Sequence, residues 1–309
     1  MKGHIVMRIA FTTPLPAEGF ERLRGYELNA PLSETEVLVS SFDKKVDAAM
    51  ISEMPRLRLI ANLGAGYNNI DLEACKARGI RVTNTPDTVT EPTAELAFAL
   101  MICAARRVSE FDRKLRNGTC EPMAVMNNLS HSLYGKTLGI IGMGRIGQAL
   151  ARRALASGMK ILYHNRHRLP EEIEKQYNAR YVMQAELLQR SDFVSLNLPY
   201  SDEVHHLIGM RELQDMKPTS YLINTARGAH VCEEDLIRAL KSGQIAGAAL
   251  DVYEYEPHIS AELLKMDNVV LSPHTGTGTW EGRIAMCENV VDNILAWVDG
   301  DEEKMNVVI

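Results

Sequence analysis

Short apolar segments alternate with amphipathic segments along most of the chain. Runs of apolar and β-branched residues that end at turn formers are typical of buried strands, and helical segments fit between them. Because parallel strands are joined by such crossovers, the alternation predicts an α/β fold with parallel sheets covered on both faces. Two series of strands are expected: Val6–Phe11, Glu36–Ser40, Leu57–Leu63 and Ile80–Thr83, then Thr137–Ile141, Lys160–His164, Phe193–Asn197, Ser220–Asn224, Ile245–Asp251 and Val269–Leu271.

Residues with strong end preferences mark the expected helices. Asp71 is a favourable N-cap and Gly79 is favourable just beyond a C-terminus, so one helix should lie between them. A longer helix is expected from about Glu91 to Asn117, between the two series of strands. The last helix should run from about Thr279 to Val298 and end near Gly300.

The composition is that of a globular protein with about two domains. The 309 residues include 34 Lys and Arg against 40 Asp and Glu, a formal charge of −6, and 46% are hydrophobic. An acidic chain without a basic block argues against nucleic acid and against membranes as partners. No apolar run is long enough to span a bilayer, and Met1 to Phe11 lack the features of a signal peptide.

The cysteine pattern bears on the compartment and on metal binding. The cysteines are odd in number, lie far apart and form no C-x-x-C pair, which suits reduced thiols better than disulfides or a zinc site. We therefore expect a cytoplasmic protein without a metal site. The five residues are Cys75, Cys103, Cys120, Cys232 and Cys287.

A glycine-rich loop is the sharpest local signal. An apolar strand leads into G-x-G-x-x-G at Gly142, Gly144 and Gly147, and a helical pattern follows. The first glycine permits a tight turn, the second lets a pyrophosphate approach the backbone, and the third lets helix and strand pack closely. The helix N-terminus, with Arg145 and Ile146, offers N–H groups to an anion. This context predicts dinucleotide binding, against the alternative of an ordinary glycine-rich turn.

The end of the next strand indicates which dinucleotide is bound. An acidic residue there would hold the ribose 2′-OH of NAD, but Asn165 stands in that place, with Arg166 and Arg168 beside it. Arginine can grip a 2′-phosphate that an acid would repel. We therefore predict that NADP(H) is preferred and NAD(H) is possible. The alternative is that both arginines lie on a solvated face.

Charged residues of unlike type follow three strands of the second series. Arg227 follows one strand, Asp251 and Glu256 follow another, and His274 follows a third. Because ligands of open α/β sheets bind beyond the carboxyl ends of the strands, these residues and the glycine-rich loop should converge. Taken singly, Arg227 could be a turn residue and Glu256 a solvated loop charge.

At this point the sequence resembles the D-isomer-specific 2-hydroxyacid dehydrogenase family over nearly the whole chain. The variant at Asn165 and Arg166 is similar to the glyoxylate/hydroxypyruvate reductase branch, which commonly uses NADPH. The motifs that carry the resemblance are Gly64–Asp71, Val82–Asp87, Thr90–Ala97, the glycine-rich loop, Asn224–Gly228, Asp251–Pro257 and Pro273–Gly276.

The resemblance implies catalytic roles for three residues. Arg227 is similar to the arginine that binds the carboxylate and carbonyl of a 2-oxo acid, His274 to the acid/base, and Glu256 to its carboxylate partner. These types suit reduction of a carbonyl group. A cation stabilises the growing negative charge, an imidazolium donates the proton, and a carboxylate orients the ring.

The resemblance also implies binding roles. Gly64, Ala65 and Gly66 are similar to a loop whose backbone amides hold the substrate carboxylate, together with Arg227 and His274. Asp251 is similar to the residue that contacts the nicotinamide end. Pro199 and Thr225 complete the expected cofactor-binding set.

The family architecture implies two doubly wound parallel-sheet domains. Residues 1–100 and 281–309 are expected to form a discontinuous flavodoxin-like substrate-binding domain, and residues 101–280 a Rossmann dinucleotide-binding domain. A homodimer is also implied. The connection at residues 118–134 lacks the tryptophans of many reductase relatives, and Met123 or Met126 could line the substrate pocket instead, or serve as plain packing.

Three functions follow from these expectations. The leading one is a D-isomer-specific, NADPH-dependent reductase of small 2-oxo acids, with glyoxylate or hydroxypyruvate as substrate. One alternative is a dehydrogenase for a bulkier D-2-hydroxy acid. The other is a non-catalytic protein that senses a dinucleotide.

Overall fold

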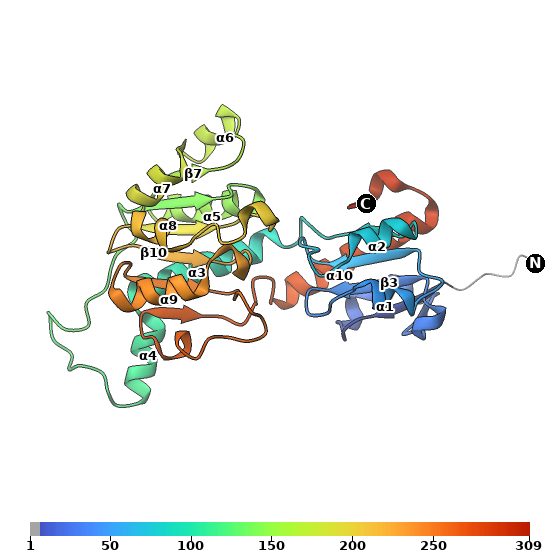
Figure 1. Ribbon diagram of the computed structural model, residues 1–309, viewed down its shortest axis with the longest axis horizontal. Coiled ribbons are helices and arrows are strands. Elements are labelled where there is room, and N and C mark those ends of the chain that lie inside the picture. Colours follow the sequence, from blue (N-terminus) through green and yellow to red (C-terminus); the bar gives the residue numbers. More distant parts are fainter. Residues whose placement is uncertain (1–6) are drawn as a thin grey trace, which may run out of the picture. The chain divides into compact units, whose positions relative to one another are not determined.

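The computed structural model describes residues 7–309 and divides the chain into two compact units (Figure 1). One unit is formed by the described residues up to Thr90 together with Thr277–Ile309, and the other by Glu91–Gly276. The start of the first predicted strand, at Val6, and most of the segment tested for a signal peptide lie outside the described residues. Among residues 7–309, no helix has the length and apolar character to cross a membrane.

The first unit contains a parallel five-stranded sheet. Its strand order is β2-β1-β3-β4-β5, which is the flavodoxin-like order. Helix α10 (Trp280–Asp299) packs on β4 and helix α2 (Leu72–Ala77) packs on β5. Helix α1 (Ala48–Ser52) packs on α2, and the 3₁₀ turn η1 (Ala17–Leu23) packs on α10. The strands are β1 (Arg8–Phe11), β2 (Glu27–Leu28), β3 (Val37–Ser41), β4 (Leu59–Leu63) and β5 (Arg81–Thr83).

The predicted helix ends of this unit are confirmed. The Asp71 side chain accepts a hydrogen bond from the Ala74 N–H at the start of α2, and Gly79 adopts a left-handed φ of 64° beyond its end. Thr279 caps α10 at the Gly282 N–H, and Gly300 ends it with φ 72°. These ends follow from local chemistry, which explains why they can be predicted from sequence.

The second unit contains a parallel seven-stranded sheet. Its order β12-β11-β10-β9-β6-β7-β8 is the Rossmann order extended by one strand, and the order reverses between β6 and β9. The two predicted doubly wound sheets are therefore confirmed. The strands are β6 (Thr137–Ile141), β7 (Lys160–His164), β8 (Ala179–Tyr181), β9 (Phe193–Leu196), β10 (Tyr221–Asn224), β11 (Gly247–Leu250) and β12 (Val269–Leu271).

Helices cover both faces of this sheet (Figure 1). Successive strand residues alternate between the faces, so Phe193 packs with the core of one face and Val194 with that of the other. The first core includes residues of α3 (Thr90–Arg106), α5 (Arg145–Ala156) and α6 (Glu171–Gln176); the second includes residues of α7 (Gln184–Arg190), α8 (Met210–Asp215) and α9 (Glu233–Ser242).

The single helix predicted from Glu91 to Asn117 is wrong. The structure has two helices, α3 and α4 (Val108–Arg116), separated at Arg107, which adopts a left-handed φ of 54°. The Arg107 guanidinium donates to both carboxylate oxygens of Glu110 and to the Leu129 carbonyl, and it lies over the Phe111 ring. The break is thus stabilised by the connection that returns past it, a tertiary effect that periodicity does not reveal.

The first boundary between the units lies at the start of α3. Ala94, Leu100 and Ala104 of this helix pack in the core of the second unit with Leu138 and Ile140 of β6. From Glu91 onwards, the helix therefore belongs to that unit. The boundaries accordingly lie at residues 90/91 and 276/277, compared with the expected 100/101 and 280/281.

Candidate functional site

A histidine–glutamate pair lies beyond the carboxyl ends of β11 and β12. The Nδ1 atom of His274 is 2.8 Å from Oε2 of Glu256, and Oε1 of the same carboxylate accepts from the Tyr253 N–H at 2.8 Å. Because a carboxylate can only accept, Nδ1 of His274 carries a proton and Nε2 is the ring nitrogen that can exchange one. The pair is therefore arranged for proton transfer at Nε2.

The Asp251 side chain holds the backbone that presents the histidine. Its two carboxylate oxygens accept from the Thr275 and Gly276 N–H groups, each at 2.8 Å, and its backbone carbonyl accepts from the His274 N–H. His274 itself adopts a left-handed φ of 53°, which is uncommon for a residue with a side chain. Asp251 is almost completely buried, and its three hydrogen bonds to residues 274–276 stabilise this conformation. Contact with the nicotinamide end stays a prediction for this residue.

Arg227 lies in the turn after β10. Asn224 fixes this turn, because its side chain accepts from the Ala226 N–H at 3.0 Å and donates to the Arg227 carbonyl at 2.9 Å. A Cβ atom on the next residue, Gly228, would overlap the backbone of Tyr253. Glycine at this position therefore lets the Arg227 turn pack directly on the segment that carries Glu256.

The charges of Glu256 and its neighbours interact. Burial raises the pKa of Glu256, but the hydrogen bond and charge of His274, the Tyr253 N–H and the charge of Arg227 outweigh it. The pKa of Glu256 therefore lies below its ordinary value. Burial lowers the pKa of Arg227, and the charge of Glu256 opposes that effect. The three predicted catalytic residues thus form one electrostatic group around an ionised carboxylate.

The glycine-rich loop has the geometry that its sequence predicts. Gly142 has φ 93°, and a Cβ there would lie 2.7 Å from the Asn197 carbonyl. A Cβ on Gly147 would lie 2.5 Å from the Gly142 carbonyl oxygen, so this glycine lets α5 pack on the loop. A Cβ on Gly144 would meet nothing within 4 Å. Open space therefore remains at the glycine where a pyrophosphate would approach.

The start of α5 lacks an internal cap. Its N-cap residue is Gly144, which has no side chain to accept from the N–H groups of the first turn, where Arg145 and Ile146 lie. An anion can take the place of such an acceptor, and the helix dipole favours it.

Two buried oxygens at the carboxyl edge of the second sheet lack partners. Among the described residues, Oδ1 of Asn197, just beyond β9, and Oγ1 of Thr225, just beyond β10, are buried without a hydrogen-bond partner. Buried polar atoms are rarely left so, and a ligand at the carboxyl edge of the sheet would supply the bonds. Together with the uncapped glycine-rich turn, these oxygens fit a dinucleotide. Pro199, also predicted for this site, lies exposed in the loop after β9.

Asn197 was not among the residues predicted from sequence. Its position directly after a buried strand and before Leu198-Pro199 is the signal that could have found it.

The two arginines after β7 have different surroundings. Arg168 forms two hydrogen bonds, at 2.8 and 2.7 Å, with the carboxylate of Glu174, which also accepts from the Tyr163 hydroxyl. The Arg168 guanidinium lowers the pKa of Glu174 to about 2. Arg166 is exposed and lies 4.0 Å from Glu203. Asn165 accepts from the Met143 N–H at 2.6 Å and so connects β7 to the glycine-rich loop.

The loop predicted to hold a carboxylate lies in the first unit, after β4. Gly64 has φ 142°, and its N–H donates to the Thr85 hydroxyl at 2.8 Å. Ala65 and Gly66 continue the turn, and their carbonyls accept from the side chains of Asn84 and Asn62. The loop is therefore fixed within its own unit.

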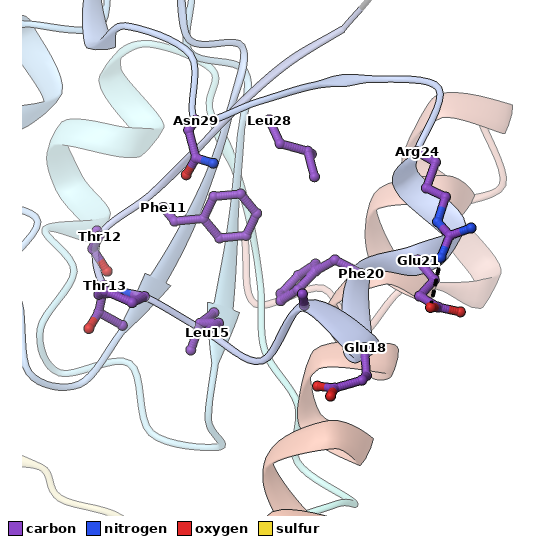
Figure 2. Close-up of a pocket in the computed structure, with 12 residues that line it drawn as sticks. Phe11, Thr12, Thr13, Leu15, Glu18, Phe20, Glu21, Arg24, Leu28 and Asn29 are labelled. Carbon is purple, nitrogen blue, oxygen red and sulfur yellow. Dashed lines mark hydrogen bonds and ion pairs between the residues drawn. The ribbon is translucent and has the colours of Figure 1, made fainter.

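A separate cavity of about 690 Å³ lies beside the end of β1 in the first unit. Figure 2 shows the rings of Phe11 and Phe20 at its apolar part, where their centroids are 5.0 Å apart, and the Arg24–Glu21 ion pair at its edge. None of the predicted site residues lines this cavity. Among residues 7–309, no group of three or more His, Cys, Asp or Glu could hold a metal ion.

Residues 98–276 match the family model described as D-isomer specific 2-hydroxyacid dehydrogenase, NAD binding domain. A glyoxylate reductase of Thermococcus litoralis is 48% identical over 272 residues, which cover 87% of this chain and 82% of the relative.

Solved structures agree with this match. A Thermus thermophilus protein aligns with TM-score 0.90 and 38% identity over 98% of this chain and 100% of its own. An NADPH-dependent glyoxylate/hydroxypyruvate reductase of Sinorhizobium meliloti, in complex with NADP and malonate, aligns with TM-score 0.83 and 32% identity over 94% and 93% of the two chains. The chain therefore belongs to the D-isomer-specific 2-hydroxyacid dehydrogenase family and is an NAD(P)-dependent oxidoreductase that acts on the CH–OH group of 2-hydroxy acids.

Proposed function

We propose that the protein reduces glyoxylate or hydroxypyruvate with NADPH as the preferred cofactor. The observation that carries the proposal is the His274–Glu256 pair, whose carboxylate interacts with the charge of Arg227. The names of the relatives from Thermococcus litoralis and Sinorhizobium meliloti support these substrates.

Each residue of this group has its own part in the reaction. The bound dinucleotide supplies the hydride that reduces C2 of the 2-oxo acid. Arg227 binds the substrate carboxylate and stabilises the negative charge that grows on the carbonyl oxygen, and its planar fork suits this better than lysine. His274 donates the proton to that oxygen through Nε2, and Glu256 orients the ring and stabilises its charged form.

The preference for NADPH rests on the residues after β7. Asn165 carries no charge that would repel a 2′-phosphate, and the exposed Arg166 can reach for one. Arg168 is held by Glu174, so in this proposal it adds positive charge near the phosphate and Arg166 makes the direct contact.

The backbone amides of Ala65 and Gly66 are proposed to bind the substrate carboxylate, and the Gly64 N–H, which donates to the Thr85 hydroxyl, holds the start of this loop. A bulkier D-2-hydroxy acid is the second candidate, since the structure of a D-lactate dehydrogenase from Aquifex aeolicus with NAD and lactic acid is also similar to this chain.

We also propose a cytoplasmic homodimer. Large apolar side chains are exposed on α4 and on the irregular connection that follows it in Figure 1. Such exposure favours burial against a second copy, which sedimentation of the protein would detect. The five cysteines are free thiols, as a reducing compartment allows. The side chains are those of Leu115, Met123, Val125, Met126 and Leu129.

Steady-state oxidation of NADPH and NADH with a panel of 2-oxo acids tests this function. We expect kcat/KM to be highest with NADPH and with glyoxylate or hydroxypyruvate, and lower with pyruvate and longer acids. A higher value for a branched or long acid would favour the second candidate. Binding of NADPH without turnover of any acid would instead indicate a dinucleotide sensor.

A further inference from the structure

Three consecutive carbonyls of the loop after β4 point towards asparagine side chains. The Asn62 Nδ2 group donates to the Gly66 carbonyl at 2.9 Å and to the Gly64 carbonyl at 3.3 Å. The Asn84 Nδ2 group donates to the Ala65 carbonyl between them at 2.8 Å. Two amide side chains thus hold all three carbonyls of the turn.

Both asparagines are themselves held in place. Asn62 is buried, and its Oδ1 accepts from the Ser40 hydroxyl at 3.1 Å, which fixes the orientation of its amide. The Asn84 carbonyl accepts from Asn293, a buried residue of α10 whose Oδ1 accepts from the Asn306 N–H at 2.7 Å. Buried amides are costly unless they are hydrogen-bonded, and this network satisfies them while it rigidifies the loop.

The direction of the carbonyls determines the direction of the N–H groups. In a trans peptide the N–H of the following residue points opposite to the carbonyl. The N–H groups of Ala65 and Tyr67 therefore point away from Asn62, and the N–H group of Gly66 points away from Asn84. Within the described part of the chain, no hydrogen-bond acceptor for these three groups is found. A run of such N–H groups forms a concave site for an anion.

We infer that Asn62 and Asn84 are positioning residues, which hold the amides of residues 65–67 ready for the carboxylate of the substrate. This inference rests on the proposed function, in which this loop binds that carboxylate. Because the amides are oriented before the substrate arrives, binding does not have to order the loop. Loss of either side chain should weaken carboxylate binding while the groups that carry out the reaction remain intact.

The test compares Asn62→Ala and Asn84→Ala with the wild-type enzyme. We expect KM for glyoxylate to rise about tenfold in each variant, because the hydrogen bonds that orient the loop are lost. The inhibition constant of oxalate, a carboxylate that does not react, should rise by about the same factor. The kcat value at saturation and the Kd of NADPH should change little. Asn268→Ala is the control, because the Asn268 side chain also donates to a backbone carbonyl, that of Ala246, but belongs to the second unit and not to the loop after β4.

The outcomes separate this inference from the proposed function. Unchanged KM and oxalate inhibition in both variants, or the same rise in Asn268→Ala, would overturn the inference and leave a structural role only. If Asn62→Ala does not fold, Asn84→Ala decides, since Asn84 is only partly buried. Wild-type enzyme that turns over no 2-oxo acid and ignores oxalate would overturn the proposed function as well.

Discussion

The Nδ1 atom of His274 lies 2.8 Å from the Oε2 atom of Glu256, although the two residues are 18 positions apart in the chain. The carboxylate is fixed by the Tyr253 N–H after β11, and the imidazole is fixed by Asp251 through its neighbours after β12. The ends of two adjacent parallel strands therefore set the geometry of the proposed proton donor.

Replacement of His274 by alanine should lower kcat by about 10²- to 10⁴-fold, the usual contribution of a positioned acid. The Kd of NADPH, measured by fluorescence, should stay close to the wild-type value, because the glycine-rich loop is unaltered. His258→Ala, at an exposed position of the same segment, is the control and should retain its kcat. Full turnover by His274→Ala would exclude the proposed role.

Alanine at Gly144 should impair dinucleotide binding without loss of stability. Its φ is −79° and its Cβ would meet no protein atom within 4 Å, so the variant can fold. The added methyl group would occupy the space in which a pyrophosphate approaches. We expect KM for NADPH to rise at an unchanged Tm, whereas Gly25→Ala, another open and exposed position, should alter neither. An unchanged KM would place the pyrophosphate elsewhere.

Alanine at Arg166 should lower kcat/KM for NADPH more than for NADH, since only NADPH carries the 2′-phosphate that this residue is proposed to bind. Arg168→Ala should change the ratio of kcat/KM for NADPH to kcat/KM for NADH less than Arg166→Ala does, because the Arg168 guanidinium is already hydrogen-bonded to Glu174. Steady-state kinetics with NADPH and with NADH give this ratio for each variant and for the wild-type enzyme. A wild-type preference for NADH, or an equal loss for both cofactors in Arg166→Ala, would defeat the proposed selection.

Glu110→Gln should reduce stability in a pH-dependent way. The side chains of Arg107 and Lys114 lower the pKa of Glu110 to about 2, from an ordinary value of 4.5. The folded state therefore holds its proton less tightly than the unfolded state, so the ion pairs stabilise it fully above about pH 4.5 and progressively less as the pH falls towards 2.

The measurement is the free energy of unfolding in urea from pH 7 downwards. The difference between wild type and Glu110→Gln should be largest at neutral pH and shrink on acidification. Glu172→Gln, at an exposed position of α6, controls for a general effect of charge. A difference that stays constant with pH would show that the charge of Glu110 does not stabilise the break between α3 and α4.

Features that depend on neighbouring residues could be predicted from sequence. Asp71, Gly79, Thr279 and Gly300 end their helices as expected, because capping needs only adjacent backbone groups. The spacing of the glycines after β6 likewise reflects local demands of turn and helix.

Features that depend on distant residues could not be predicted. The break at Arg107 needs the carbonyl of Leu129, and the pairing of Arg168 needs Glu174 on a separate helix. Strands β2 and β8 were missed because they are very short edge strands whose pairing is decided by the sheet beside them. Sequence motifs and the resemblance indicate the residues of the candidate site. The positioning role of Asn62 and Asn84 depends on their hydrogen bonds to the carbonyls of residues 64–66, which only the structure reveals.

The most direct test of the account follows the hydride itself. The wild-type enzyme would be given glyoxylate and NADPH that carries deuterium at C4, with each face labelled in a separate sample. We predict that deuterium from one of the two samples appears at C2 of the glycolate product, and that His274→Ala forms this product far more slowly. NADPH that binds but transfers no label to glyoxylate, hydroxypyruvate or pyruvate would contradict the account.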